Sequence, residues 1–289
     1  MSFNTWGSGA NYNKTVTETV EVIRTIDPDI IALLEVRAES VPCTSICPPS
    51  GPSRAPEIAR ELGYYIYENH KVNALQWANA ILSKYPILRS TENDIGVVLD
   101  IYGNHVAMFG IHLNDFPYQP YQLSGIPCDG AQSLKSAEDA IAAATTARGP
   151  GMDLLLQEMS GLSDDVSTII VAGDFNEPSH LDWTESAASI GRYPLAVKYP
   201  TTLRLETLGF TDAYRAIYPD EISKPGFTWT PFGSLDEKSE HYDRIDYIFV
   251  RNATVVSAKI IGEKSPEADI VINPWPSDHR AVMATVSIP

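Results

Sequence analysis

The segment Thr168-Ile169-Ile170-Val171-Ala172-Gly173-Asp174-Phe175-Asn176 carries the main architectural signal of this chain. Residues 168–172 form a continuous apolar and β-branched run, which is typical of a strand buried on both faces. The run passes directly into Gly173, the carboxyl group of Asp174 and the amide of Asn176. Open α/β sheets bind ligands just beyond such strand ends, so the segment predicts an α/β fold with a site at one sheet edge.

A second run of the same form lies near the start of the chain. Residues 30–34 are Ile-Ile-Ala-Leu-Leu, and Glu35 follows them directly. Before this run, residues 15–26 place valine and isoleucine at helical spacing, which predicts an amphipathic helix. The sequence Asp27-Pro28-Asp29 ends that helix. The two halves of the chain thus share a weak repeat, in which polar residues follow the ends of apolar strands.

The rest of the chain divides into short strands and helices. We expect strands at 1–6, 64–67, 77–83, 95–101, 106–112, 244–250, 255–261 and 281–287, and helices at 57–62, 136–159 and 179–190. Gly149-Pro150-Gly151 is expected to interrupt the second helix, and Ser179-His180-Leu181-Asp182 to open the third as a capping box. Residues 41–56 and 113–135 are expected to be irregular loops. No linker divides the chain, so residues 1–289 are predicted to form one mixed α/β domain.

Six segments place a carboxylate, amide or imidazole at the tip of an apolar strand or within one. They are Phe3-Asn4, Leu34-Glu35, Ile111-His112, Asp174-Phe175-Asn176, Arg244-Ile245-Asp246-Tyr247 and Ser277-Asp278-His279. Charged groups at the ends of buried strands are costly unless they are paired or bind a metal ion. If the six converge, they form an acidic pocket with two imidazoles, which suits Mg²⁺, Mn²⁺ or Ca²⁺ better than Zn²⁺. Because Mg²⁺ leaves coordination positions to phosphate oxygens, this pocket predicts phosphoester chemistry.

In this order, the six segments resemble the motif series of the endonuclease/exonuclease/phosphatase superfamily, which has a deoxyribonuclease-like fold. Each motif is weak alone, whereas six in the family's order, over nearly the whole chain, are specific. The resemblance implies a four-layer α/β sandwich, in which two packed mixed β-sheets are flanked by helices and the site lies at one edge. It also implies hydrolysis of a phosphodiester or phosphomonoester that depends on Mg²⁺ or Mn²⁺, with Ca²⁺ also compatible.

The resemblance assigns four residues to metal binding. Glu35 corresponds to the main metal ligand, and Asn4 assists it. Asp246 belongs to the same polar cluster. Asp278 is either the partner of His279 or a second metal ligand.

The resemblance assigns four further residues to catalysis. Asp174 corresponds to the aspartate that activates water, and Asn176 orients it. His279 corresponds to the imidazole that contacts the scissile phosphate or transfers a proton. His112 corresponds to the residue that stabilises charge in the transition state. Phosphoryl transfer requires these parts: a positioned water, a base and neutralisation of the phosphoryl oxygens.

Several of these residues also have a purely structural interpretation. Asp246 could form a salt bridge with Arg244, and His112 could be a hydrogen-bonded core histidine. Asp278-His279 could cap a helix. The occurrence of all six motifs in order favours the functional interpretation.

Two residues outside the motif roles are predicted to contact substrate. Asn79 precedes a strand that the family brings near the site, and Trp229 flanks a motif segment. An aromatic ring near the site could stack on a base or line an apolar groove, and packing that orders the loops is the alternative. The segment 113–135 follows His112 directly and is expected to lie beside the pocket.

The formal charge of the chain limits the substrate. There are 21 Lys+Arg against 37 Asp+Glu, a net charge of −16, and the basic residues form no run. Binding of extended nucleic acid needs a basic face, so long nucleic acids are disfavoured. We therefore expect a phosphoester of a small molecule or a lipid headgroup. A nuclease acting on DNA or RNA is the alternative, and a catalytically inactive binding module is the third class.

The cysteines and the start of the chain bear on its compartment. Free thiols, a Cys43–Cys47 bridge and a bridge from Cys128 to the loop that holds the other two are all compatible with the sequence. No signal peptide or membrane-spanning run is present, but Met1 opens within a predicted strand. We expect a secreted or periplasmic monomer whose leader has been removed.

Overall fold

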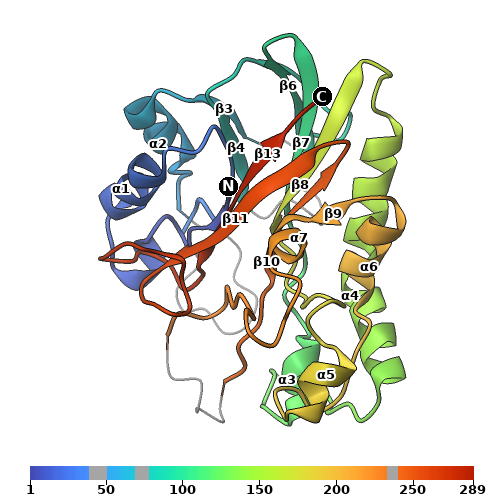
Figure 1. The fold of residues 1–289 in the computed structure, drawn as a ribbon. Coiled ribbons are helices and arrows are strands. Elements are labelled where there is room, and N and C mark those ends of the chain that lie inside the picture. Colours follow the sequence, from blue (N-terminus) through green and yellow to red (C-terminus); the bar gives the residue numbers. More distant parts are fainter. Residues whose placement is uncertain (39–50, 69–77, 233–239) are drawn as a thin grey trace.

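Two mixed β-sheets pack face to face, and helices cover their outer surfaces (Figure 1). The computed structural model describes residues 1–38, 51–68, 78–232 and 240–289. The first sheet contains, in spatial order, β12 (Ile270–Val271), β11 (Thr254–Gly262), β13 (Ala281–Ser287), β1 (Ser2–Asn4), β2 (Ile30–Leu34), β4 (Ala80–Ser83) and β3 (Tyr65–Glu68). The second contains β5 (Ile87–Ser90), β6 (Gly96–Ile101), β7 (Asn104–His112), β8 (Val166–Asp174), β10 (Asp246–Arg251) and β9 (Thr211–Asp212). The predicted four-layer α/β sandwich is confirmed.

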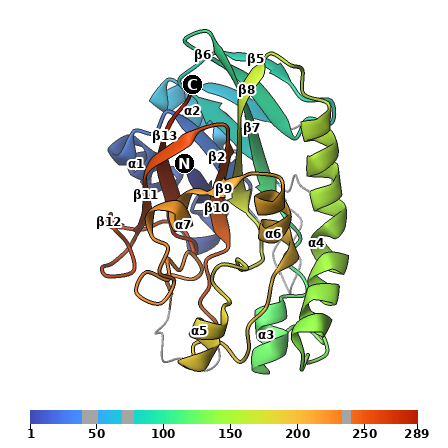
Figure 2. The same ribbon diagram turned by 45° about the vertical axis from the view of Figure 1, so that its right-hand side comes forward.

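The described residues form seven α-helices, four of which cover the outer faces of the two sheets. The helices are α1 (Val16–Ile26), α2 (Ala55–Leu62), α3 (Gln119–Ser124), α4 (Ala137–Ser160), α5 (Glu185–Ser189), α6 (Pro200–Thr207) and α7 (Ala213–Ile217), with a short 3₁₀ helix, η1 (Ala10–Tyr12). α1 and α2 cover the first sheet, whereas α4 and α6 cover the second (Figures 1 and 2). α3 and α5 lie at the lower end of both views. Among the described residues, no helix is both long and apolar enough to cross a membrane.

Strand β2 is apolar throughout because both of its faces are buried. Ile31 and Leu33 pack into the core beneath α1 and α2, whereas Ala32 and Leu34 pack into the core between the sheets. All four side chains are fully buried. β8 alternates in the same way between the inter-sheet core and the core beneath α4. Both continuous apolar runs are therefore explained by burial on two faces.

The strand register brings the polar strand ends together. β1 pairs in parallel with β2, with Asn4 opposite the last residue before Glu35. β7 pairs in parallel with β8, with His112 opposite Asp174. β10 pairs antiparallel with β8, with Asp246 opposite the same Asp174. His112, Asp174 and Asp246 therefore lie in one row across three neighbouring strands of the second sheet.

The long helix α4 differs from the expectation at Pro150. The helix continues through this residue, so the predicted interruption is wrong. Tertiary packing outweighs the local cost of the proline, because Met152 and Leu155 in the following turn are fully buried against the second sheet. The segment 113–135 is not wholly irregular either, since it contains α3.

The predicted helix at 179–190 is wrong at its start. The residues after Ser179 form a turn, in which the backbone N–H of Asp182 donates to the Ser179 carbonyl oxygen at 3.0 Å. The carboxylate of Asp182 pairs with two buried arginines, so it is not available for a capping box. Helix α5 begins only after Thr184, whose hydroxyl oxygen caps it.

Some expectations fall on residues that the structure does not describe. Cys43 and Cys47 are among them, so the disulfide alternatives stay predictions, and Cys128 is half-buried in the segment after α3. β4 begins at Ala80, later than the predicted residue 77, which also lies outside the described ranges.

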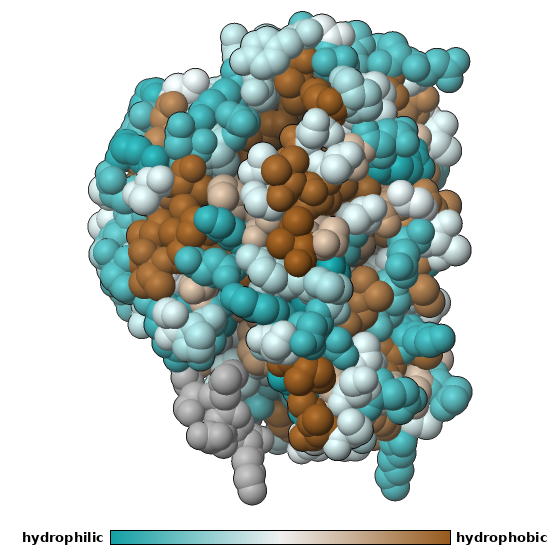
Figure 3. Space-filling model, in the orientation of Figure 1, coloured by the Kyte–Doolittle hydropathy of each residue, from teal (hydrophilic) through white to brown (hydrophobic). Residues whose placement is uncertain are grey.

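The surface is mostly polar on the face drawn in Figure 3, where hydrophobic side chains gather near the middle, over β11 and β13. Tyr12 of η1 is 41% exposed, and Tyr102 of the β6–β7 hairpin is 88% exposed. Isolated apolar residues on a surface are ordinary. Tyr12 differs because the rings of Trp6 and Phe232, both half-buried, lie against it.

Candidate active site

Asn4 joins the two sheets at their polar edge. Its Nδ2 group donates hydrogen bonds to Glu35 Oε1 at 2.9 Å and to Asp174 Oδ2 at 3.0 Å. Glu35 follows β2 of the first sheet, and Asp174 ends β8 of the second. The two carboxylates that the sequence singles out therefore share one buried amide donor.

His112 faces the same two carboxylates. Its Nε2 atom lies 3.7 Å from Glu35 Oε1 and 3.7 Å from Asp174 Oδ2. The side chain is buried at the end of β7, where it borders the acidic cluster. This placement favours the functional interpretation of His112 over that of a core histidine.

His279 lies between two aspartates. Its Nδ1 atom is 2.8 Å from Asp246 Oδ2, and its Nε2 atom is 3.7 Å from Asp174 Oδ2. The segment that carries His279 is tied to β1, because the Ser277 hydroxyl donates to the Asn4 carbonyl oxygen at 2.7 Å. The same hydroxyl oxygen accepts a hydrogen bond from the His279 backbone N–H at 3.1 Å.

The surrounding charges set the protonation of His279. Burial by itself lowers the pKa of this imidazole, but the carboxylates of Asp246 and Asp174 outweigh burial and raise the pKa well above its usual value. A cationic imidazole next to an acidic cluster can bind a phosphate oxygen. Burial also raises the pKa of the neighbouring Asp278 to about 6.

The donor set fits a divalent ion. Two groups of side chains bring their ligand atoms within 4.8 Å of one another: Glu35, His112 and Asp174 form the first, and Asp174, Asp246 and His279 form the second. Asp246 Oδ1 and Asp278 Oδ1 are buried and have no hydrogen-bond partner among the described residues. An unpaired buried carboxylate oxygen is costly, and a bound cation removes that cost. Asp278 is in neither group, so the metal-ligand prediction has less geometric support at this residue than at Glu35.

Asn176 holds Asp174 through its backbone. The Asn176 N–H donates to Asp174 Oδ1 at 2.8 Å, whereas the side-chain Nδ2 group donates to the Leu113 carbonyl oxygen at 3.0 Å. The side chain of Asn176 thus ties the β8 end to the segment after β7. The predicted orienting contact exists, but the main chain makes it.

Three residues just beyond strand ends have left-handed backbone conformations. The φ angles are 46° at Trp6, 51° at Glu35 and 49° at Asn176. This region is uncommon for residues other than glycine and is unfavourable for bulky ones. Such strain costs about 1–3 kcal/mol per residue and concentrates at functional sites.

The two predicted substrate-contact residues lie near the cluster in different ways. Asn79 is buried, and its Nδ2 group donates to the Gly110 carbonyl oxygen of β7 at 3.4 Å. Trp229 is half-buried, and its ring centroid lies 6.5 Å from that of His279. The Trp229 backbone also bridges to His279. Trp229 therefore borders the site directly, whereas Asn79 packs against the strand that delivers His112.

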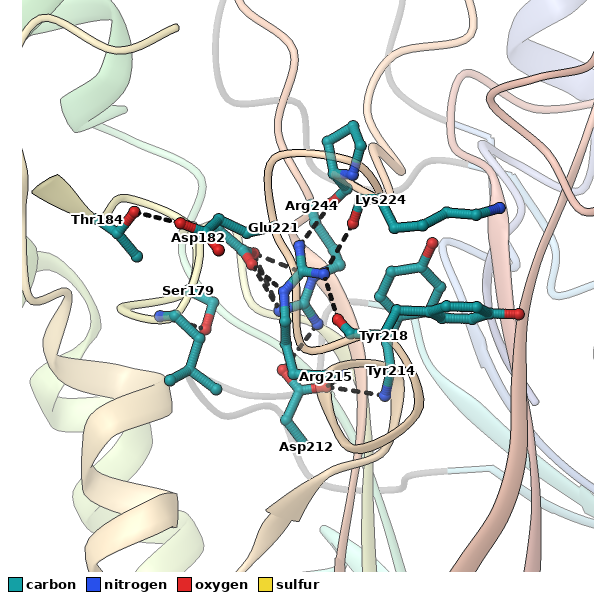
Figure 4. A network of polar contacts seen from close by, with 12 residues as sticks. Ser179, Asp182, Thr184, Asp212, Tyr214, Arg215, Tyr218, Glu221, Lys224 and Arg244 are labelled. Atoms are coloured by element: carbon teal, nitrogen blue, oxygen red, sulfur yellow. Dashed lines mark hydrogen bonds and ion pairs between the residues drawn. The ribbon is translucent and has the colours of Figure 1, made fainter. Parts of the chain in front are cut away.

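Arg244 does not pair with Asp246. Its guanidinium group donates to Asp182 Oδ2 at 3.0 Å and to Asp212 Oδ2 at 2.7 Å (Figure 4). Arg215 Nε donates to the other oxygen of Asp182 at 2.6 Å, which completes a buried network of two arginines and two aspartates. The structural alternative for Asp246 is therefore wrong, and Asp246 is left to pair with His279.

Asp243 is a buried hydrogen-bond acceptor for several side chains, and the sequence did not predict this role. Its buried carboxylate accepts hydrogen bonds from the Tyr118 hydroxyl at 2.7 Å and from Trp183 Nε1 at 2.8 Å. His241 Nδ1 lies 2.8 Å from the same carboxylate. Because the Asp243 backbone also bridges to Trp229, this residue holds the segment before α3 beside the site. Its place directly before the motif segment Arg244-Ile245-Asp246-Tyr247 was the only sequence signal.

A sequence model described as the Endonuclease/Exonuclease/phosphatase family matches residues 1–279. The chain belongs to this family. It is accordingly a metal-dependent hydrolase of phosphoester bonds, as the motifs implied. A Caenorhabditis elegans relative, the uncharacterized protein F14F9.5, is 30% identical over 305 residues, which cover 98% of this chain and 89% of the relative.

Solved structures support the same fold at low sequence identity. An endonuclease/exonuclease/phosphatase family protein from Leptotrichia buccalis C-1013-b has a TM-score of 0.54 and 15% identity, covering 94% of this chain and 92% of its own. An AP endonuclease from Archaeoglobus fulgidus has a TM-score of 0.52 and 16% identity, with coverage of 98% and 97%. TDP2 from C. elegans has a TM-score of 0.52 and 18% identity, with coverage of 99% and 74%.

Proposed function

We propose that this chain hydrolyses a compact, non-polymeric phosphoester, such as that of a small molecule or a lipid headgroup, with Asp174 as the water-activating base. One observation carries the assignment of the base. Asp174 contacts Asn4, lies 3.7 Å from each of two imidazoles and belongs to both groups of candidate metal ligands. No other described residue belongs to both groups.

The metal would be held by Glu35 and by carboxylates of the second group, and Mg²⁺ or Mn²⁺ suits their oxygens. When bound, the ion would supply positive charge against the phosphoryl oxygens. We assign Asn4 a positioning role. Its Nδ2 group holds Glu35 and Asp174 together, and its Oδ1 atom accepts a hydrogen bond from the Trp6 backbone N–H at 3.1 Å.

The remaining steps fall to the aspartate and the two histidines. Asp174, held by the Asn176 N–H, accepts the proton of the attacking water. His279, kept cationic by Asp246, binds a phosphoryl oxygen and can return a proton to the leaving group. His112 lies beside Glu35 and Asp174. It stabilises the negative charge on the phosphoryl group as the phosphoester bond breaks.

Charge and loop placement support a compact substrate. The net charge of −16 repels a long polyanion wherever the metal does not screen it. α3 and the segment before it follow His112 in the chain. The hydrogen bond from Tyr118 to Asp243 holds this segment in place beside the site, where it would limit the approach of a large substrate. Trp229 lies beside His279, with ring centroids 6.5 Å apart, and adds bulk next to the site.

A nuclease is the second candidate. The aromatic rings beside the site favour it, because bases stack on aromatic side chains. The similar structures that are named an AP endonuclease and TDP2 share the fold at 16% and 18% identity, which supports a nucleic-acid substrate only by analogy.

A substrate panel tests the proposal. Phosphomonoesters, phosphodiesters, lipid headgroup esters and single- and double-stranded DNA are each supplied with Mg²⁺, Mn²⁺ or EDTA. We expect a compact ester to give the highest kcat/KM in Mg²⁺ or Mn²⁺, with no turnover in EDTA and a kcat that is about 10²–10⁴-fold lower in Asp174→Asn. A higher kcat/KM for plasmid or oligonucleotide would overturn the compact-substrate proposal and establish the nuclease.

A further inference from the structure

We propose that Trp6, Tyr12 and Phe232 form a stacking platform for the nucleobase of a nucleotide-type substrate whose phosphate occupies the candidate active site. We call these three residues the aromatic platform. The inference rests on the proposed function and narrows its substrate class from compact phosphoesters in general to those that carry a base near the scissile phosphate.

The three rings form one continuous aromatic group. Trp6 and Tyr12 stack with centroids 5.7 Å apart and planes 29° apart. Phe232 closes the group, with centroids 4.8 Å from Tyr12 and 6.0 Å from Trp6. Tyr12 is 41% exposed, and the other two rings are half-buried. The group thus presents part of its aromatic surface to solvent, mainly through Tyr12.

The chain places the aromatic platform next to the metal ligands. The Trp6 backbone N–H donates to Asn4 Oδ1, the amide that holds Glu35 and Asp174. The Gly7 N–H donates to the Glu35 carbonyl oxygen at 2.8 Å. On the other side, Phe232 lies three residues after Trp229, whose backbone bridges to His279. Both segments that carry the platform therefore leave directly from the candidate active site.

The loop that carries Trp6 is held rigidly. The Thr5 hydroxyl is hydrogen-bonded to the carbonyl oxygens of Leu34 and Glu35, at 2.8 and 3.0 Å. Gly7 adopts a φ of 72° and lies so close to Asn11 that a Cβ there would be 2.9 Å from the Asn11 Oδ1 atom. A preorganised loop loses little entropy when a ligand binds, which favours a binding role.

The conformation of Trp6 is the second observation that points to function. A bulky aromatic residue at a φ of 46° is an outlier, and Trp6 is half-buried rather than part of the buried core. Backbone strain that packing does not demand concentrates at ligand sites. A tryptophan that only covered the surface could adopt an ordinary conformation instead.

The chemistry of the platform favours a base over other flat or apolar groups. Nucleobases stack on aromatic rings, and their polar edges stay in water, which an open platform allows. A lipid tail would need an enclosed apolar groove to be buried. Lys14 Nζ lies 5.6 Å from the Tyr12 ring centroid, so a cation is also available beside the platform for a nucleotide's negative charge.

Calorimetric titration of the full chain in Mg²⁺ with two matched probes tests the inference. The probes are thymidine 5′-monophosphate and 2-deoxyribose 5-phosphate, in which a hydroxyl group replaces the base at C1. We expect the nucleotide to bind about tenfold more tightly, the order that one stacked base contributes. The same titrations in Asp174→Asn exclude a contribution from turnover. Equal affinity for the two probes, or a nucleotide Kd above about 1 mM, overturns the inference.

Variants test whether the difference in affinity between the two probes comes from the aromatic platform. Trp6→Ala and Phe232→Ala should each bring the affinity ratio of the two probes close to one, whereas Trp6→Phe should keep most of it. Tyr102→Ala removes an 88% exposed ring from the far end of β7 and should leave the ratio unchanged. Circular dichroism checks that each variant is folded. An unchanged ratio in both platform variants rejects the assignment.

The two proposals fail in different ways. If the wild-type protein hydrolyses compact esters but binds both probes equally, the proposed function stands and the aromatic platform is only packing. If the affinity ratio depends on Trp6 while no ester is hydrolysed with any metal, the nucleotide site stands and the proposed function fails.

Discussion

Asp246 Oδ2 lies 2.8 Å from His279 Nδ1, and both side chains are buried. The neighbouring Arg244 is directed away from this pair and donates to Asp182 and Asp212. If Arg244 neutralised Asp246, the carboxylate could not hold His279 in its cationic form. The two buried charge systems are therefore separate: one lies in the candidate active site, and the other joins Arg244 and Arg215 to Asp182 and Asp212.

We expect Asp174→Asn to lower kcat by about 10²–10⁴, the usual effect of removing a general base. KM should change much less, because the amide keeps the shape of the side chain. Steady-state kinetics on the best substrate measures both parameters. Asp164→Asn, an exposed residue just before β8, is the matched control and should have wild-type rates. A wild-type kcat in Asp174→Asn would show that another group activates the water.

Removal of the charge at Glu35 should weaken metal binding. Glu35→Gln keeps the acceptor for the Asn4 amide but lowers the attraction for a divalent ion, so the metal concentration for half-maximal activity should rise. Titration of EDTA-treated protein with Mg²⁺ or Mn²⁺ measures that concentration. Full activity of the wild-type protein in excess EDTA would contradict metal dependence altogether.

Loss of Arg244 should destabilise the fold strongly. Arg244→Met leaves Asp182 and Asp212 buried with less compensation, which costs about 3–5 kcal/mol. Urea denaturation gives the change in unfolding free energy. The control is Arg24→Ala, which removes a surface pair with Glu21 whose side chains are 46% and 57% exposed, and costs about 0–1 kcal/mol. Equal losses of unfolding free energy in the two variants would mean that the buried network does not stabilise the fold.

Stability should depend on pH through His241. Burial lowers the pKa of this imidazole, but the Asp243 carboxylate outweighs it and raises the pKa above the usual 6.5. The pair therefore contributes its full stability below about pH 6.5 and loses it as the pH rises through the higher folded-state pKa. The difference in Tm between the wild-type protein and His241→Gln should shrink from pH 6 to pH 9. A difference that stays constant over this range would refute the ion pair.

The sequence predicted the parts of the fold that depend on local pattern. β2 and β8 were identifiable because both of their faces are buried, which makes every residue apolar. The helix expected at 15–26, from its apolar spacing and the stop at Asp27-Pro28-Asp29, is observed as α1 at Val16–Ile26. The polar residues after these strands were identifiable as site candidates because a charge at the end of a buried strand is costly unless it is paired or binds a metal ion.

The sequence could not predict what depends on distant packing. Pro150 is an interruption by local rules, and only the sheet beneath α4 shows why the helix continues. The partners of Arg244, at Asp182 and Asp212, lie 62 and 32 residues away, so no spacing rule connects them. Asp243 resembles an ordinary polar residue until the structure brings Tyr118 to its carboxylate.

The hydrogen bonds of Asn4 also bear on how the protein acquires activity. Asn4 and Glu35 are 31 residues apart, whereas Asn4 and Asp174 are 170 residues apart. Contacts of such long sequence separation form late, since the entropy of closing the loop is lost before the contact is gained. The nascent chain therefore has no assembled candidate active site until the second half has been synthesised and has docked on the first. We therefore expect a partly synthesised chain that lacks Asp174 to have no hydrolytic activity.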